Sequence, residues 1–505
     1  MKQYRIIALL LTLLLALAAC GEKPAGETSS ASSSQNTVQE EVPSPVQVPF
    51  TLAVYADYSL NPTLAANRAN LTLAPLLYEP LFAVDGHFQA QPVLCQSWTA
   101  SEDKLVWTFT LRDRITFSDG TPFTAREAAE ALELARSSRG RYAQRLADVA
   151  LISGEDQNLT ITLRRPNGDL PALLDIPIAL GDGDRPLGTG PYVLTETGDE
   201  FSLTARSGWW QTDKTLPVQT IPLHRVSKSD DLIYAFDAGE VSLVDVDLMA
   251  TNAMGYGGNY QTWDYATTDF LYLGFNTQEG LCRSPQVRRA LAQGVDRNTI
   301  TSAIYANHAT PALLPVHPDS PLYSQSAAEA APGYTPEGLA TQTEELKLVG
   351  KELVLIVNSE NVSKVSSAQH IVYQLEAAGL KVELRQLSFE DYTTALARGE
   401  FDLYLGETVF TANFDLAPLL GSGGALNYGG WWAEGADGLL WTMHSASPET
   451  KPAAAEALFE LLNEQAPIVP IAFKNGSVLT QWGRLSGLSP TRGNVFYQIE
   501  NWIVK

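Results

Sequence analysis

The sequence predicts an α/β fold built from at least two domains. The chain has 505 residues, more than one ordinary hydrophobic core holds, and 45% of them are apolar, as in globular proteins. Between residues 351 and 406, apolar runs of strand length alternate with segments of helical periodicity. Strand and helix patterns that alternate in this way are typical of three-layer α/β domains.

The N-terminal segment has the pattern of an export signal. Lys2 and Arg5 precede an apolar run that is too short to span a bilayer, and Leu-Ala-Ala-Cys closes this run at Cys20. The closing residues resemble the lipobox of bacterial lipoproteins, which implies a signal peptide at 1–19 and a lipid on Cys20. An ordinary secretory signal is the alternative. Residues 20–47 are rich in Ser, Glu and Pro, so we expect them to form a disordered tether.

The charge balance argues against a nucleic-acid-binding function. The chain carries 57 acidic and 34 basic residues, which gives a formal net charge of -23. A surface this acidic repels the phosphate backbone of DNA or RNA. We therefore expect no nucleic-acid partner.

Cysteine is too rare for a disulfide scaffold. Only Cys20, Cys95 and Cys282 are present, and they lack the paired spacing of a zinc site. We expect Cys95 and Cys282 to be separate, semi-buried thiols. A disulfide between them is the alternative, because its geometry cannot be read from a sequence.

Strand and helix patterns begin near Val48, where the folded part is expected to start. Each strand is a short run rich in β-branched and aromatic residues. Each helix has its apolar side chains on one face and a recognisable start, such as the Thr124–Glu127 capping box or Ser284 before Pro285. The elements expected before residue 351 are strands at 50–55, 105–111 and 158–164, and helices that start at Thr124, Ser284 and Asp296.

The segment 351–406 has the most regular pattern. Gly379 and Gly399 are expected to end its two helices, because glycine adopts the left-handed conformation of a helix end without strain. Ligands of open α/β sheets bind beyond the carboxyl ends of the strands, which directs attention to residues 406–432. The expected elements are strands at 353–357, 380–385 and 401–405, and helices at 365–378 and 388–398.

No catalytic motif has the spacing that its chemistry needs. The sequence lacks a Gly-x-Ser-x-Gly elbow, a His-Glu-x-x-His motif and a Gly-x-x-x-x-Gly-Lys-Ser/Thr loop. The Gly188–Pro191 segment is expected to be a turn, because Pro191 removes an amide that a phosphate loop would use. We expect His308 and His317 to be surface loop residues rather than metal ligands. The sequence therefore predicts no enzyme, no cofactor and no metal site.

Five short motifs follow one another along the chain. They are Leu76–Phe82, the stretch from Ser97 to Ala125 with its Trp-Thr-Phe-Thr-Leu-Arg and Phe-Ser-Asp-Gly-Thr-Pro-Phe-Thr-Ala runs, Leu187–Tyr192, Leu273–Asn276 and Val287–Arg297. In this order they resemble the landmarks of the family 5 extracellular solute-binding proteins, the oligopeptide, dipeptide and nickel receptors of ABC importers. The resemblance covers about residues 50 to 500.

The resemblance implies a two-lobed fold of the periplasmic-binding-protein type II, with an extra subdomain in lobe I. Lobe I would comprise residues 48–268 and 474–505, with the extra subdomain at about 76–185, and lobe II would comprise residues 269–473. The chain would cross between the lobes near Thr268–Asp269 and near Phe473–Lys474, and these crossings would form the hinge. The ligand would lie between the lobes, which close around it.

One acidic residue is the candidate for the amino group of a peptide. In the peptide receptors of the family, an aspartate in a loop after a lobe II strand commonly holds that group. Asp415 is the nearest equivalent, although the tryptophan and the Asp-Pro pair of the family motif are missing from Glu407–Pro418. A buried carboxylate needs a cationic partner, which a ligand ammonium would supply. The alternative is that Asp415 caps a helix at 416–420.

Aromatic and amide side chains provide the other ligand candidates. Glycines on both sides of residues 425–428 allow a ligand to approach the backbone, while rings and an amide offer flat walls and hydrogen bonds. A mobile loop whose tryptophans pack against a lobe is the alternative. Trp209–Trp210 is expected to be structural. The expected ligand-binding residues are Asp415, Asn427, Tyr428, Trp431, Trp432 and, after the first strand, Tyr58.

These expectations describe a lipoprotein that captures short peptides for the permease of an ABC importer. It would be a monomer held by the lipid on Cys20 to the outer face of the cell membrane, in the periplasm if an outer membrane is present. A different solute in the same cleft, such as a nickel chelate, a sugar oligomer or a signalling peptide, is one alternative. An exported hydrolase and a purely structural surface lipoprotein are alternatives from other classes.

Overall fold

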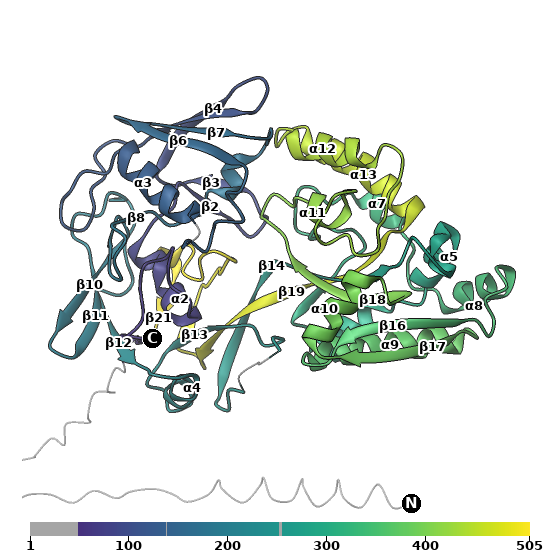
Figure 1. Cartoon of the computed structure of the whole chain (residues 1–505). Helices are drawn as coiled ribbons and strands as arrows, with labels where there is room; N and C mark the ends of the chain where they lie inside the picture. The colour runs from purple at the N-terminus through teal and green to yellow at the C-terminus, as the bar shows by residue number, and fades with distance from the viewer. Residues whose placement is uncertain (1–48, 138, 252–254) are drawn as a thin grey trace, which may run out of the picture. The chain divides into compact units, whose positions relative to one another are not determined.

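The computed structural model describes residues 49–137, 139–251 and 255–505 (Figure 1). The predicted signal peptide, Cys20 and the predicted tether lie outside these residues. Among the residues that the structure describes, none of the helices combines the length and the apolar character that crossing a bilayer requires.

The first half of the described chain forms two four-stranded sheets and two short strand pairs. The first sheet joins β1 (Leu52–Val54), β12 (Thr220–Arg225), β11 (Glu200–Ala205) and β10 (Tyr192–Thr197), in that order. The second joins β4 (Cys95–Ala100), β5 (Val106–Leu111), β7 (Asn158–Leu163) and β6 (Val149–Glu155). The pairs are β2 (Phe82–Val84) with β3 (Ala90–Pro92), and β8 (Ala179–Leu180) with β9 (Leu187–Gly188).

Three helices accompany these sheets: α2 (Arg68–Leu77), α3 (Ala125–Arg136) and α4 (Ser229–Asp237). The predicted capping box at the start of α3 is confirmed, since Thr124 and Glu127 each bind the backbone of the other. The apolar face of α3 lies in the same core as the second sheet, with Leu132 and Phe109 both fully buried.

A seven-stranded sheet dominates the second half of the chain (Figure 1). Two long antiparallel strands, β14 and β19, lie next to each other in it, and the register between them shifts between Ala266 and Asp269. The strand order is β13 (Leu243–Val246), β19 (Ile468–Gln481), β14 (Tyr260–Phe275), β18 (Leu403–Val409), β16 (Glu352–Asn358) and β17 (Lys381–Leu387), with β15 (Ala309–Pro311) also on β19. The last pair is β20 (Leu485–Ser486) with β21 (Ile503–Val504).

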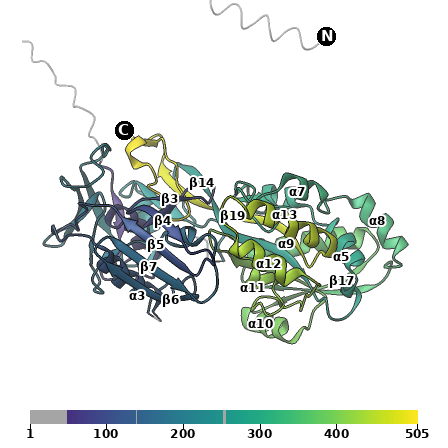
Figure 2. The ribbon, with the colours of Figure 1, turned by 90° about the horizontal axis from the view of Figure 1, so that it is seen from above.

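Helices cover this sheet, and α12 and α13 lie side by side in both views (Figures 1 and 2). The helix that follows β17 has the predicted limits: Ser388 accepts a hydrogen bond from the amide of Asp391, and Gly399 ends the helix with a φ of 69°. The helices are α5 (Pro285–Ala292), α6 (Arg297–Thr299), α7 (Gln325–Ala330), α8 (Pro336–Glu345), α9 (Val362–Ala377), α10 (Phe389–Arg398), α11 (Ala417–Leu420), α12 (Ala436–Ser445) and α13 (Lys451–Gln465).

The fold is the predicted two-lobed α/β fold, because the sheets enclose separate cores that two long strands connect. One core contains Phe109 and Leu132, another contains Leu355 and Ile371, and β14 and β19 run through the sheet that borders several cores. The exact lobe boundaries remain a prediction. Lobe I and lobe II below name the parts of the chain on either side of the predicted crossings.

The two cysteines in the described part of the chain are free thiols. Cys95 lies in the core of the second four-stranded sheet, and Cys282 lies in the core of lobe II. Both side chains are fully buried rather than half-buried. The prediction of separate thiols is therefore confirmed.

His317 is not a surface residue, so that prediction is wrong. Its side chain is fully buried, and its ring lies 5.2 Å from the ring of Phe88 and 5.3 Å from that of Phe473. The loop runs inward because its apolar residues Leu314 and Val316 are themselves buried. Burial lowers the pKa of His317 to about 4. His308 is half-buried instead, and its Nδ1 lies 2.9 Å from a carboxylate oxygen of Asp264.

The predicted turn at Gly188–Pro191 connects β9 with β10 and packs against the end of α2. A Cβ atom on Gly188 would lie 1.9 Å from the carbonyl oxygen of Leu77, whereas a Cβ on Gly183 would meet nothing within 4 Å. Only glycine therefore allows β9 to approach α2 this closely.

We expect Gly188→Ala to lower the free energy of unfolding by about 2–3 kcal/mol, because the backbone of Leu77 must move away. Urea unfolding followed by circular dichroism measures this change. Gly183→Ala is the matched control and should change the free energy by no more than about 0.5 kcal/mol. Equal stabilities of the two variants would contradict the proposed close packing.

Candidate ligand-binding site

A buried ammonium group lies on β19 beside β14, at the predicted crossings between the lobes. The side chain of Lys474 is only 5% exposed, and its Nζ lies 2.8 Å from Glu407 Oε1, 2.9 Å from Asp269 Oδ2 and 3.3 Å from Asp247 Oδ2. Asp269 is on β14, Glu407 is on β18, and Asp247 directly follows β13. One side chain thus joins four neighbouring strands at the predicted hinge.

This hinge cluster has more carboxylates than ammonium groups. Lys364, on α9, provides the second ammonium, 3.7 Å from Glu407 Oε2. Burial and the nearby charge of Glu407 raise the pKa of Asp269 to about 7, although Lys474 opposes this shift. Burial alone would also raise the pKa of Glu407, but Lys474 and Lys364 outweigh it and lower that pKa. We infer that protonation of Asp269 relieves the excess negative charge of the cluster.

A cavity of about 500 Å³, called the lobe II cavity below, lies beside the hinge cluster; apart from Thr251, all of its lining residues belong to lobe II. It is found where the sequence predicts a ligand, at the carboxyl ends of parallel strands: Asn358 ends β16, and Glu407–Val409 ends β18. Asn358 is 6% exposed, and its Oδ1 has no hydrogen-bond partner among the described residues; the same holds for Asp269 Oδ1. Buried acceptors without partners are rare, so this wall favours a ligand with N–H donors.

Two cavities of lobe I adjoin this one. They have volumes of about 360 Å³ and 500 Å³ and share Arg68, Thr72 and Asp245. Val409 lines both the larger of the two and the cavity of lobe II. The guanidinium of Arg68 is held by Asp245, at 3.0 Å, and by the hydroxyl of Tyr265. The three cavities thus border the hinge from both lobes and form the candidate binding cleft.

The lobes also touch each other away from the hinge. The amide of Gly168 in lobe I donates to the carbonyl of His444 in lobe II at 3.0 Å, and Lys451 Nζ lies 3.5 Å from Asp169 Oδ2. The rings of Phe88 and Phe414 lie 5.1 Å apart in an edge-to-face arrangement. The two lobes are therefore in contact at the hinge cluster and at this second place, on another side of the cleft.

Asp415 lies close to this second contact. Its Oδ1 accepts a hydrogen bond from the amide of Ala417 at the start of α11, at 3.1 Å, and lies 3.7 Å from Nδ1 of His444. Asp415 therefore binds one amide in the first turn of α11, although the N-cap residue of this helix is Leu416. The side chain is 21% exposed, and its role toward a ligand remains a prediction.

The other predicted ligand residues lie in the loop after α11 or on the surface. Asn427 donates to the carbonyls of Gly421 and Trp431 and accepts from the amide of Trp431, so it fixes the loop. Tyr428 is half-buried against the ring of Tyr404, and Trp431 is only 3% exposed. Trp432 and Tyr58 are exposed by 67% and 58%. None of these residues lines the three cleft cavities, and their contact with a ligand remains a prediction.

Sequence reasoning missed the charged residues of the cleft. Lys474 had a visible signal, because it interrupts the apolar run of β19 and a lone lysine in a buried strand needs anionic partners. Asn358 and Glu407 follow the rule for strand ends and could have been selected by it. The arginines that line the larger lobe I cavity come from distant segments and carried no local signal.

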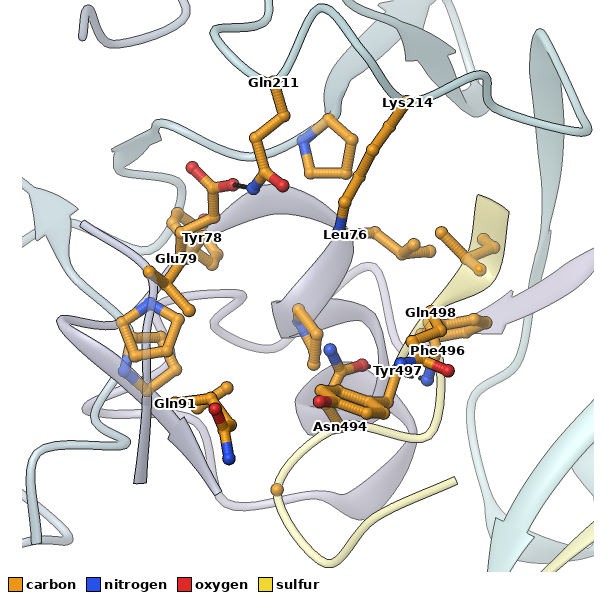
Figure 3. Close-up of a pocket in the computed structure, with 18 of the residues that line it drawn as sticks. Leu76, Tyr78, Glu79, Gln91, Gln211, Lys214, Asn494, Phe496, Tyr497 and Gln498 are labelled. Atoms are coloured by element: carbon orange, nitrogen blue, oxygen red, sulfur yellow. Dashed lines mark hydrogen bonds between the residues drawn. The ribbon is translucent and has the colours of Figure 1, made fainter. Parts of the chain in front are cut away.

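A further cavity of about 480 Å³ lies entirely within lobe I (Figure 3). Its wall contains the buried carboxylate of Glu79, whose pKa is raised by burial. Trp209 and Trp210 donate their indole N–H groups to Glu79 at 3.1 Å and 2.7 Å, and Gln211 and Thr189 each donate at 2.9 Å. Every lone-pair direction of this carboxylate is thus used within the fold, which agrees with the structural role predicted for the two tryptophans.

The family model for the bacterial extracellular solute-binding proteins, family 5, matches residues 89–426. This match covers more than half of the chain. The chain belongs to this family. Among the described residues, no group of three or more His, Cys, Asp and Glu side chains is arranged to hold a metal ion.

Similar proteins support the family and the fold. The nickel-binding periplasmic protein of Escherichia coli K12 is 27% identical over 256 residues, which are 46% of this chain and 48% of that protein. The glutathione-binding protein GsiB of the same organism is 28% identical over 291 residues, 53% of this chain and 56% of that protein. The chain therefore spans about half the length of the curated relatives it matches.

A solved structure extends the likeness to the whole fold. The unliganded, open form of the periplasmic murein tripeptide binding protein MppA aligns with a TM-score of 0.73 and 20% sequence identity, over 91% of this chain and 98% of that protein. At this level of identity the likeness concerns the fold alone. It agrees with the two-lobed periplasmic-binding-protein architecture.

The raised pKa of Asp269 predicts a pH-dependent stability. Folded Asp269 has a pKa of about 7 and holds its proton below that pH, whereas an unfolded aspartate loses it near its ordinary pKa of 3.8, so the free energy of unfolding falls as the pH rises between these values. We expect the free energy of unfolding of the wild type to fall, relative to that of Asp269→Asn, by at most about 1.4 kcal/mol per pH unit from pH 5 to pH 7.

Urea unfolding at pH 5, 6, 7 and 8 measures this difference. Asp182→Asn, a change to a carboxylate on the surface of lobe I, should keep the pH dependence of the wild type. Parallel pH curves for the wild type and Asp269→Asn would contradict the assignment.

Proposed function

We propose that this protein captures short peptides between its two lobes and delivers them to the permease of an ABC importer. In this proposal the protein binds its ligand and catalyses no reaction. Membership of family 5 supports a binding role, since the relatives named above are binding proteins.

The observation that carries the proposal is the opposite charge of the two walls of the cleft. Asp269, Glu360 and Glu407 line the lobe II cavity against one lysine, Lys364. The larger lobe I cavity has four arginines against two aspartates. A peptide with free termini is a zwitterion, so its ammonium suits the first wall and its carboxylate suits the second.

The names of the similar proteins favour the same ligand class. Glutathione and murein tripeptide are both short peptides, and they name one relative of this chain and one protein of the same fold. The nickel-binding relative supports a chelated metal as the second candidate in the same cleft. A sugar oligomer, a signalling peptide, an exported hydrolase and a purely structural role have no comparable support.

The cellular location that we propose is based on the N-terminal sequence. We propose that a lipid on Cys20 holds the protein on the outer face of the cell membrane, in the periplasm if an outer membrane is present. Residues 20–47 would act as the tether between the anchor and the lobes. A monomer is sufficient for this role, because both walls of the cleft come from one chain.

We expect native mass spectrometry of protein purified gently from cells in rich medium to reveal a series of bound peptides that denaturation releases. Small-angle X-ray scattering should show a smaller radius of gyration when such a peptide is added back, because the lobes close around it. A ligand-free mass together with an unchanged radius across a tripeptide library would argue against peptide capture. A bound metal chelate would instead support the nickel alternative.

Two aspartates compete for the ammonium of the peptide. We assign the ammonium to Asp269, because it lines the lobe II cavity, where buried acceptor atoms have no hydrogen-bond partner among the described residues. The sequence motif instead assigns the ammonium to Asp415. Calorimetry measures the affinity for a tripeptide and the affinity for its N-acetylated form, which lacks the ammonium group. The ratio of the first affinity to the second reports how strongly the protein binds the ammonium. We expect Asp269→Asn to lower this ratio by about tenfold or more, because a hydrogen bond to a charged group is lost.

The same ratio in Asp415→Asn decides between the two assignments. The asparagine keeps an oxygen that can accept a hydrogen bond from the amide of Ala417, so the variant removes the charge and keeps this hydrogen bond. If the ratio is lowered in Asp415→Asn and unchanged in Asp269→Asn, then Asp415 rather than Asp269 binds the ammonium. Asp182→Asn again serves as the control and should leave the ratio unchanged.

A further inference from the structure

Two large apolar side chains are exposed near the point where the described chain begins. Trp482, directly after β19, is 62% exposed, and Ile503, on β21, is 58% exposed. Both belong to the last part of the chain, which the predicted boundaries assign to lobe I. A single exposed apolar residue is normal on a protein surface, whereas neighbouring ones mark a surface that meets a partner.

Trp482 lies close to the first described residues, because one serine joins them. The hydroxyl of Ser242 accepts a hydrogen bond from the amide of Thr51 at 3.0 Å and lies 3.5 Å from the carbonyl oxygen of Pro49. The carbonyl of Ser242 accepts from the amide of Gln481 at 3.2 Å, and Trp482 is the next residue. The end of β19 is therefore held beside the start of the described chain.

Ile503 lies beside the same junction. The ring of its neighbour Trp502 lies 6.3 Å from the ring of Phe50, in an edge-to-face arrangement. The amide of Lys505 donates to the carbonyl of Arg484 at 2.9 Å, which joins β21 to the turn after β19. In both views the C-terminus lies beside the start of the described chain (Figures 1 and 2). The two exposed apolar residues thus belong to one region of the surface.

Each of the two apolar residues is followed, two positions later, by a basic residue: Arg484 and Lys505. Glu500 of the same segment is paired with Lys214 at 2.8 Å, which balances its charge, and Glu240 adds an exposed carboxylate beyond Ser242. An exposed tryptophan with basic neighbours suits the surface of a bilayer, where aromatic rings lie at the level of the headgroups and cations contact the phosphates.

The proposed lipid anchor brings a bilayer close to this region. The predicted tether, residues 20–47, separates Cys20 from the described chain, and a flexible chain of this length spans about 30 Å. The junction is therefore held near lipid at a high effective concentration. Under this condition, apolar contacts that are too weak to bind a membrane alone are sufficient to dock the protein on it.

We propose that Trp482 and Ile503, with Arg484 and Lys505 beside them, dock the end of lobe I on the lipid bilayer. This proposal rests on the lipid anchor of the proposed function and adds a defined orientation of the protein at the membrane. The docked residues all belong to lobe I, so lobe II remains free to move when the cleft closes. The cleft would then keep one orientation toward the permease in the open and closed forms.

The test uses the full lipidated chain in vesicles of phosphatidylglycerol and phosphatidylcholine with brominated acyl chains. Bromine quenches the fluorescence of a tryptophan only on contact, so it reports rings that reach the bilayer. The chain has ten tryptophans, and we expect bromine to remove about a tenth of the emission, because one ring lies at the interface. Trp482→Phe should abolish this loss. Trp432→Phe, at a position of lobe II that is 67% exposed, should keep it.

Ile503→Asp tests the contact itself, because the reporter Trp482 stays in place. A carboxylate at the bilayer surface opposes docking, so the loss of emission should fall by about half or more. Val362→Asp is the matched control, since Val362 is 75% exposed in lobe II, and should leave the loss unchanged. A wild type that bromine does not quench, or a loss that persists in Trp482→Phe or Ile503→Asp, would overturn the docking.

Flotation of the protein with the vesicles tests the anchor separately. If the wild type does not float, the lipid anchor is wrong, and a hexahistidine segment in place of residues 1–20 then holds the chain on vesicles that contain a nickel-chelating lipid. The same quenching measurement, with the same outcomes, decides the docking there. If Trp482→Phe and Ile503→Asp instead convert a dimer of this unlipidated chain into a monomer in gel filtration, a second copy covers the region and the docking is overturned.

Discussion

The ion pairs of Lys474 are the constraint on which the rest of the cleft depends. A buried ammonium must be surrounded by acceptors, and here they come from β14, from β18 and from the residue after β13. Removing one partner from such a cluster typically costs about 3–5 kcal/mol, because the remaining charges stay buried and unpaired. The cluster therefore holds β13, β14, β18 and β19 together at the predicted hinge, beside the cavities of the cleft. It also raises the pKa of Asp269 to about 7, and a ligand cation would stabilise the charged form of this carboxylate.

The opposite charges of the two walls follow from how each wall is built. Lobe II presents the end of β18, where Glu407 follows the apolar part of the strand, and Asp269 lies on the neighbouring strand β14, opposite Val409. Lobe I presents loops, and its arginines are held near the cavity by Asp175, Asp245 and the ring of Tyr142. The strongly negative net charge of the chain keeps the outer surface soluble, while the lobe I wall remains locally positive.

Local signals in the sequence predicted the elements well, and distant contacts explain what it could not predict. The Thr124 capping box, the Ser388 start and the Gly399 end of α10 depend on residues within a few positions of each other. The rule for strand ends found the position of the lobe II cavity, although the residues chosen from it, Asn427 and Trp431, bind their own loop. His317 was predicted to be a surface loop residue, whereas the neighbouring apolar side chains carry it into the core. The arginine wall was invisible because Arg145 and Arg492 meet only after folding.

The division of charge between the lobes has a consequence for closure. A ligand shifts an equilibrium between open and closed forms only by its difference in affinity for the two forms. A ligand that contacts one wall alone binds both forms equally and leaves that equilibrium unchanged, however tightly it binds. A zwitterion that spans the cleft gains its second set of charged hydrogen bonds only when the lobes approach each other. In a cleft with Asp269 on one side and Arg492 on the other, ligand recognition and lobe closure are therefore the same event, and a permease that detects closure would detect only ligands with both charges.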